Sequence, residues 1–101
     1  MPVFEERIKE LSELLDVTPT SREKTLFREI YFDHLKEIAP YARMEHLGSF
    51  VDQYKYLLYQ ANRSYRHENI EGTRKILNKA AETGRNIWRM HLAFQSYRYI
   101  K

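Results

Sequence analysis

The sequence contains no cysteine. This absence excludes disulfide bonds, thiol nucleophiles and zinc sites built from cysteine, and it is compatible with a reducing compartment. No apolar run approaches the roughly 18 residues that cross a bilayer, and the N-terminus lacks the basic and then apolar layout of a secretion signal. We therefore expect a cytoplasmic protein without a membrane segment.

Glycine and proline are also scarce, with three of each among 101 residues. Hydrophobic residues make up 43 % and charged residues 31 %, which is the balance of a folded, helix-favouring chain and not of a disordered one. A chain of this length can bury one modest core. The sequence thus predicts a single domain that covers residues 1–101.

The strongest helical pattern runs from Ile70 to Tyr99. Apolar or small residues recur there at steps of three and four, as on one face of a helix, at Leu77, Ala80, Gly84, Ile87, His91 and Phe94. Gly84 has two interpretations: it lies at a close helix crossing inside one continuous helix, or it ends one helix just before another begins. We favour the continuous helix over residues 70–99, because the apolar phase passes through Gly84 without slipping.

Three shorter segments show the same periodicity and predict helices over residues 2–15, 21–38 and 42–67. Each helix has one apolar stripe that must be buried against the others. The expected fold is therefore an all-α, single-domain antiparallel bundle of four helices. A three-helix core with the first helix laid across it is the alternative.

Local signals set the ends of the second helix. Thr20 and Glu23 have the spacing of a capping box, in which each side chain accepts a hydrogen bond from a free backbone N–H at the start of a helix. Pro40 is expected to end the same helix, because proline lacks the backbone donor and clashes with the preceding turn.

The third segment offers the most informative surface. Its core stripe is expected at Leu47, Phe50, Tyr54, Leu57, Ala61 and Tyr65. At 100° per residue, the opposite face is aromatic and basic and consists of Tyr56, Tyr59, Arg63 and Arg66. We take these four residues as the candidate binding surface. A second candidate surface lies at the C-terminal end, at Leu92, Tyr97 and Tyr99.

Charge is distributed unevenly along the chain, whose net charge is +3. Residues 1–16 carry five acids against two bases, whereas the chain from Leu47 onward carries ten bases against four acids. This asymmetry either lets an acidic first helix pack beside basic ones or steers an acidic partner to the basic half.

Few residues suggest chemistry. His34 and His91 fall on core stripes and are expected to be hydrogen-bonded inside the bundle, and no spacing predicts a metal or cofactor site. The run from Arg85 and Asn86 to His91 resembles the Arg, polar residue, spacer and His signature of HEPN ribonuclease domains, which are helical bundles. The resemblance implies metal-independent RNA cleavage, with phosphate bound by arginine and protons moved by histidine.

The sequence favours a small binding module that docks on a protein partner to regulate or inhibit it, without catalysis. Exposed tyrosine and arginine are the residue types enriched at interface hot spots, and an acidic partner would match their charge. The alternatives are a nucleic-acid-binding protein that uses the basic and aromatic C-terminal half, a HEPN-like ribonuclease, and a self-associating homodimer.

Overall fold

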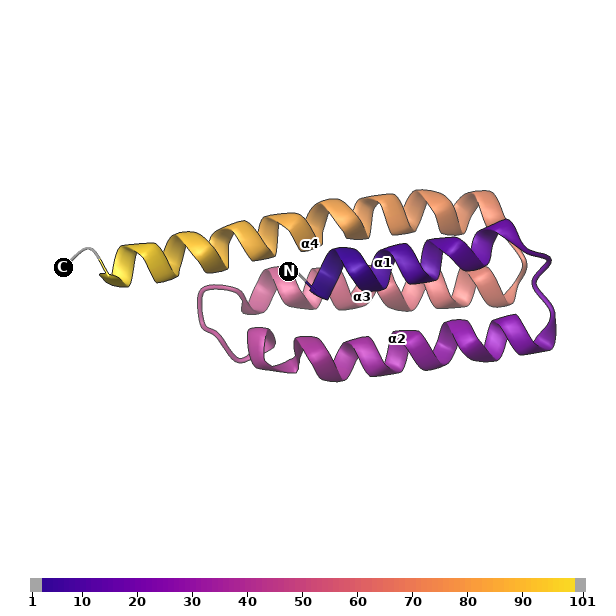
Figure 1. Ribbon diagram of the computed structural model, residues 1–101, viewed down its shortest axis with the longest axis horizontal. Helices are drawn as coiled ribbons and strands as arrows, with labels where there is room; N and C mark the ends of the chain where they lie inside the picture. Colours follow the sequence, from indigo (N-terminus) through magenta and orange to yellow (C-terminus); the bar gives the residue numbers. More distant parts are fainter. Residues whose placement is uncertain (1–2, 100–101) are drawn as a thin grey trace.

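The computed structural model describes residues 3–99, which form an antiparallel bundle of helices (Figure 1). The helices are α1 (Val3–Glu13), α2 (Ser21–Ala42), α3 (Gly48–Arg66) and α4 (Ile70–Tyr99), with a 3₁₀ turn η1 (Leu14–Asp16) after α1. The bundle measures 53 × 21 × 19 Å. The prediction of an all-α fold is confirmed, and the described residues contain no strand.

Helix α1 is a full member of the bundle, not a segment laid across three others. It runs alongside its neighbours and packs against α2 and α4 (Figure 1). Phe4 and Leu11 are 1 % and 0 % exposed, so both belong to the shared core. The alternative of a three-helix core is therefore wrong.

Gly84 lies where α1 crosses α4, and α4 continues through it without a break. A Cβ atom at Gly84 would lie 2.9 Å from Cβ of Phe4 and 3.2 Å from Cε1 of Tyr54. Real Cβ contacts are almost never as short as the 2.9 Å to Phe4, so only glycine allows α1 to approach α4 this closely. The prediction of a close crossing in a continuous helix is confirmed.

Two predicted helix ends are wrong. Helix α2 passes through Pro40 and ends at Ala42, because Pro40 lies in the last turn, where its missing N–H removes one hydrogen bond near an end that frays anyway. The predicted start of the third helix near residue 42 is also wrong, because α3 begins at Gly48. Tight turns around Met44 occupy the interval, with the N–H groups of Leu47 and Gly48 both donating to the Met44 carbonyl.

The capping box at the start of α2 does not form. The Thr20 hydroxyl donates to a carboxylate oxygen of Glu23 at 2.6 Å, and neither side chain accepts from the backbone. The two side chains satisfy each other, since a hydroxyl and a carboxylate form a strong charge-assisted hydrogen bond.

Two expected core residues are exposed. Phe50 is 41 % exposed because residues one apart on a helix differ by 100°, and Val51, at 0 %, takes the inward position. Phe94 is 41 % exposed because the C-terminal part of α4 extends beyond the ends of the other helices (Figure 1). The last turns of α4 therefore have neighbours on fewer sides than the rest of the helix.

Candidate functional site: the outer face of α3

The outer face of α3, defined as Tyr56, Tyr59, Arg63 and Arg66, lies in solvent. Tyr56 is 59 % exposed and Tyr59 48 %, and both arginines are exposed. The helical register places these side chains opposite Tyr54 and Tyr65, which are 0 % exposed. The predicted exposure of this face is confirmed.

The two tyrosines stack on each other one turn apart. Their ring centroids lie 6.5 Å apart with an angle of 23° between the planes. They border an open hollow of about 370 Å³ between α3 and the start of α4, which we call the tyrosine hollow. Its lining includes Tyr56, Tyr59, Arg63, His67, Asn69 and Ile76. Aromatic rings, one apolar floor residue and several hydrogen-bond donors thus meet in one concave surface.

Arg66 belongs to a different hollow from Arg63. It faces α2, where it borders a space of about 250 Å³ together with Lys24, Thr25 and Arg28. We call this space the basic notch. The sequence interpretation grouped all four α3 residues as one surface, whereas the structure divides them between two hollows on either side of the helix. Arg66 lies about 60° from Arg63 around the helix axis, on the side away from Tyr56, and about 10 Å beyond Tyr59 along the axis.

One exposed aromatic side chain on α2, Phe32, was not named from the sequence, whereas its neighbour Tyr31 is buried at 7 % exposed. Phe32 is 50 % exposed and stacks on Tyr31 with ring centroids 5.1 Å apart. Burial raises the pKa of Tyr31, and the nearby phenol of Tyr59 raises it further. The nearness of Tyr31 to Tyr59 depends on the antiparallel register of α2 and α3, which no local pattern in either segment supplies.

The connection between α3 and α4, which borders the tyrosine hollow, is fixed by its own hydrogen bonds. The N–H of Asn69 donates to the Ser64 carbonyl at 3.0 Å and the N–H of Glu68 to the Tyr65 carbonyl at 2.9 Å, which is the pattern of a Schellman cap. Glu68 adopts a left-handed conformation with φ 61°, a position where glycine is usual. The side-chain oxygen of Asn69 then accepts from the N–H of Gly72 at 3.0 Å and caps α4.

A network of polar side chains runs from the core to the surface between α1, α2 and α3. Nε2 of His34 lies 2.6 Å from the Tyr54 hydroxyl, and Nδ1 lies 3.1 Å from Oε1 of Glu37. Arg7 donates to both oxygens of Glu37, at 2.8 and 2.9 Å. The prediction that His34 is hydrogen-bonded in the core is confirmed.

The network sets the charges of its members. Burial lowers the pKa of His34, which keeps the ring neutral. Hydrogen bonds from Arg7 lower the pKa of Glu37 and keep it ionised, while burial raises the pKa of Tyr54 well above its usual range. Tyr54 and His34 are both 0 % exposed, so this part of the network joins α2 to α3 inside the core. Arg7 and Glu37 form its outer end, where they border a hollow of about 330 Å³.

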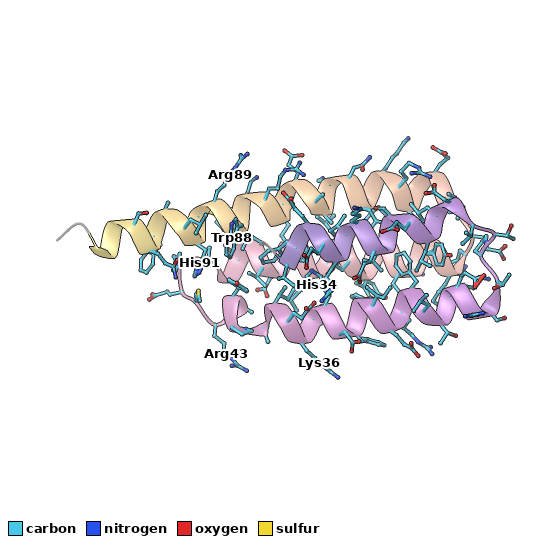
Figure 2. All side chains as sticks on the ribbon, in the orientation of Figure 1. His34, Lys36, Arg43, Trp88, Arg89 and His91 are labelled. Atoms are coloured by element: carbon cyan, nitrogen blue, oxygen red, sulfur yellow. The ribbon has the colours of Figure 1, made fainter. Side chains whose placement is uncertain are left out.

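The HEPN-like residues are not brought together. Arg85 and Asn86 are exposed, whereas His91 is half-buried. The His91 and Tyr41 rings meet edge to face, with their centroids 5.2 Å apart. Figure 2 shows His91 directed toward the connection between α2 and α3. Arg85 and His91 differ by about 120° around the axis and 9 Å along it. Nδ1 of His91 has no hydrogen-bond partner among the described residues, so the expectation of a hydrogen-bonded His91 is wrong for this part of the chain.

The second candidate surface is described only in part. Leu92 is 43 % exposed, while the side chains of Tyr97 and Tyr99 lie outside the described residues. No group of three metal-ligating side chains occurs among the described residues. Within that same part of the chain, no helix combines the length and apolar character needed to cross a membrane.

No protein-family model, no curated protein and no solved structure matches the chain.

Proposed function

We propose that the protein is a small binding module without catalysis, which docks an acidic segment of a protein partner on the outer face of α3 and thereby regulates it. The observation that carries the proposal is the stacked and half-exposed pair of Tyr56 and Tyr59 at the border of the tyrosine hollow, with Arg63 beside it. A cytoplasmic setting is part of the proposal and fits the absence of cysteine.

The tyrosine pair suits binding because it is ordered before any partner arrives. A tyrosine has few rotatable bonds, and each ring here is further restrained by its stacked neighbour on a rigid helix. Less conformational entropy is then lost on association, and large amphipathic rings and arginine are the residues that most often dominate binding energy. The hollow of about 370 Å³ lies within the size range of sites that receive side chains or small ligands.

The charge of α3 indicates the chemistry of the partner. The helix carries Lys55, Arg63 and Arg66 against a single acid, Asp52. An acidic segment that also presents an apolar side chain would match both the cations and the tyrosine hollow. Such charge complementarity mainly accelerates association and selects among partners.

The test is affinity capture from the native lysate after nuclease treatment, with wild type and two double variants. Tyr59→Ala with Arg63→Ala removes the proposed contacts, while Arg85→Ala with Leu92→Ala removes an exposed cation and an exposed apolar side chain on α4. We expect the first variant to lose the captured protein and the second to retain it, since a hot-spot truncation costs about 2 kcal/mol or more of binding free energy. Both variants should keep the melting temperature of the wild type within a few degrees.

A crosslinking probe locates the contact directly. Photoreactive benzoylphenylalanine at Gln60, which lines the tyrosine hollow, should label the same partner, whereas the probe at Lys79 on α4 should not. Loss of the partner from the α4 variant alone would instead place the working surface at the end of α4. Crosslinks between two copies of the chain would indicate a homodimer in place of a separate partner.

Nucleic acid is the second candidate for this face. The stacked tyrosines could receive bases, while Arg63 and Arg66 contact phosphates. Binding of this kind weakens steeply with salt, because counterions are released from each neutralised phosphate. A captured species that nuclease removes, with an affinity for single-stranded oligonucleotides that falls steeply between 50 and about 200 mM salt, would favour this candidate.

A further inference from the structure

The basic notch between α2 and α3 is lined by cations and a hydroxyl group. Lys24 and Thr25 are adjacent on α2, Arg28 lies one turn later, and Arg66 approaches from the end of α3. No acid is among the residues that line this space of about 250 Å³. Ammonium, guanidinium and hydroxyl groups from two helices thus border one small concave surface.

These groups match one chemical class of ligand. Guanidinium groups donate pairs of hydrogen bonds to phosphate oxygens, lysine adds a point charge, and threonine adds a neutral donor. A phosphomonoester carries close to two negative charges at neutral pH and three acceptor oxygens, so it can use contacts from several directions at once. We propose that the basic notch binds a phosphomonoester dianion and that Glu68 regulates its occupancy as an internal competitor.

Glu68 supplies an independent observation. Its carboxylate lies 3.2 Å from Nζ of Lys24, and this is the ion pair that Glu68 makes among the described residues. Glu68 nevertheless occupies the left-handed position of the cap, where glycine would be less strained. An exposed ion pair contributes little stability, so the contact with Lys24 does not offset the backbone strain. If Glu68 pairs with Lys24 until a bound anion displaces its carboxylate, the presence of an acid at this strained position is explained.

The surroundings favour a point ligand over a polynucleotide. The Glu68 carboxylate contacts Lys24 at the notch, and Glu29 borders a neighbouring hollow that shares Thr25 with it. A nucleic-acid strand needs a continuous basic track for its regularly spaced phosphates. The notch instead presents one basic site with acids around it, which suits a single dianion.

This inference goes beyond the docking proposal, because a small anion can bind in the notch whether or not a protein docks at the tyrosine hollow. The two proposals therefore fail separately. Loss of the protein partner from the Tyr59 and Arg63 double variant says nothing about phosphate binding, and phosphate binding needs no protein partner.

The experiment is a nuclear magnetic resonance titration of ¹⁵N-labelled protein with inorganic phosphate, free phosphoserine and a phosphoserine peptide. We expect amide shifts concentrated at residues 24–28 and 66–68. Arg28→Gln with Arg66→Gln should weaken binding by about tenfold or more, since two charge-assisted contacts are lost. Lys79→Gln with Arg85→Gln changes the net charge equally on α4 and should leave the affinity within about twofold, because its charges lie outside the notch.

The role of Glu68 has its own variant. Glu68→Gln keeps the size of the side chain and removes its charge, so the affinity for phosphate should rise by about fivefold, the effect of one like charge at contact distance in water. An unchanged or weakened affinity in Glu68→Gln would overturn the competitor role. Equal losses in the Arg28/Arg66 variant and the α4 control would overturn the notch as the site.

Two further arms test the class of ligand. Binding of phosphoserine should strengthen between pH 5 and 7.5, because its second proton leaves near pH 6, whereas binding of sulfate, a dianion throughout, corrects for any titration of the protein. If the affinity for phosphoserine changes with pH in the same way as the affinity for sulfate, the dianion assignment is wrong.

Tighter binding of a phosphodiester oligonucleotide than of the phosphoserine peptide would overturn the preference for a monoester. Tighter binding of the peptide than of free phosphoserine would support a phosphorylated protein segment as the natural ligand. Equal binding of the two would support a small phosphorylated molecule.

Discussion

The hydroxyl of Tyr54 on α3 lies 2.6 Å from Nε2 of His34 on α2. Nδ1 of His34 lies 3.1 Å from the ionised Glu37, so the Nδ1–H donates to the carboxylate and Nε2 accepts from the tyrosine. With this neutral tautomer, every hydrogen bond in the network is satisfied. A proton on Nε2 would donate to the Tyr54 oxygen and leave the tyrosine O–H without this acceptor. Burial of the ring also favours its neutral form.

Tyr54→Phe should therefore destabilise the fold by about 1–3 kcal/mol, because Nε2 of His34 would remain buried without its donor. Urea unfolding monitored by circular dichroism measures the change. Tyr56→Phe is the matched control, since its hydroxyl lies on an exposed ring, and it should change the free energy of unfolding by less than about 0.5 kcal/mol. Equal effects of the two variants would show that the Tyr54 hydroxyl contributes nothing to stability.

Acid should destabilise the fold in two stages. The pKa of His34 is lower in the folded chain than in the unfolded chain, so the unfolded chain takes up the proton first as pH falls below about 6.5. The lowered pKa of Glu37 adds a second loss below about pH 4.5. Urea midpoints at pH 7.5 and 5.5 isolate the first stage, and His34→Gln should remove most of the difference between them. A midpoint that rises on acidification would contradict the neutral histidine.

At Gly84, replacing glycine by alanine should destabilise the protein, although alanine is normally the better helix former. Alanine is about 1 kcal/mol more favourable than glycine inside a helix, but a Cβ at this position would lie 2.9 Å from Cβ of Phe4, which is attached directly to the α1 backbone. We expect Gly84→Ala to lower the free energy of unfolding and Gly84→Leu to lower it by about 1–3 kcal/mol through overpacking. Gly48→Ala is the control, because its nearest contact would be an ordinary 3.5 Å, and it should be neutral or stabilising.

Glu68→Gly should stabilise the protein. Glycine removes the cost of about 1–2 kcal/mol that an ordinary residue bears in the left-handed conformation, while the exposed ion pair with Lys24 contributes at most about 1 kcal/mol. The melting temperature of this variant should rise by a few degrees. Lys24→Gln, which removes the ion pair and keeps the strain, should leave it unchanged or slightly lower. A fall in stability for Glu68→Gly would mean that the ion pair outweighs the backbone strain.

Most of the fold can be predicted from the sequence, because each helix has its own apolar periodicity. The bounds of α4 and the role of Gly84 follow from one uninterrupted apolar phase. Phe50 could not be placed, since its burial depends on whether it or Val51 turns inward, and that choice is made by the neighbouring helices. The extent of α2 depends on how much a terminal turn tolerates Pro40, and the local pattern gives no measure of it.

The candidate site was less predictable than the fold for a related reason. Periodicity within α3 is enough to expose Tyr56, Tyr59 and Arg63 on one face. The basic notch, in contrast, depends on residues of α2 that lie about 40 positions earlier in the chain. Such pairing is set by the register between two helices, which neither segment specifies alone.

Helix α4 is one continuous element, but its two ends should differ in how readily they open. Leu77 and Ala80 are buried in the core that α4 shares with the other helices. Phe94 is 41 % exposed and stacks on the ring of His46, with the two centroids 3.9 Å apart. A few helical turns without packing are unstable in water. Amide hydrogens from Leu92 to Ser96 should therefore exchange through local fraying, while those near Leu77 exchange only when the whole bundle unfolds.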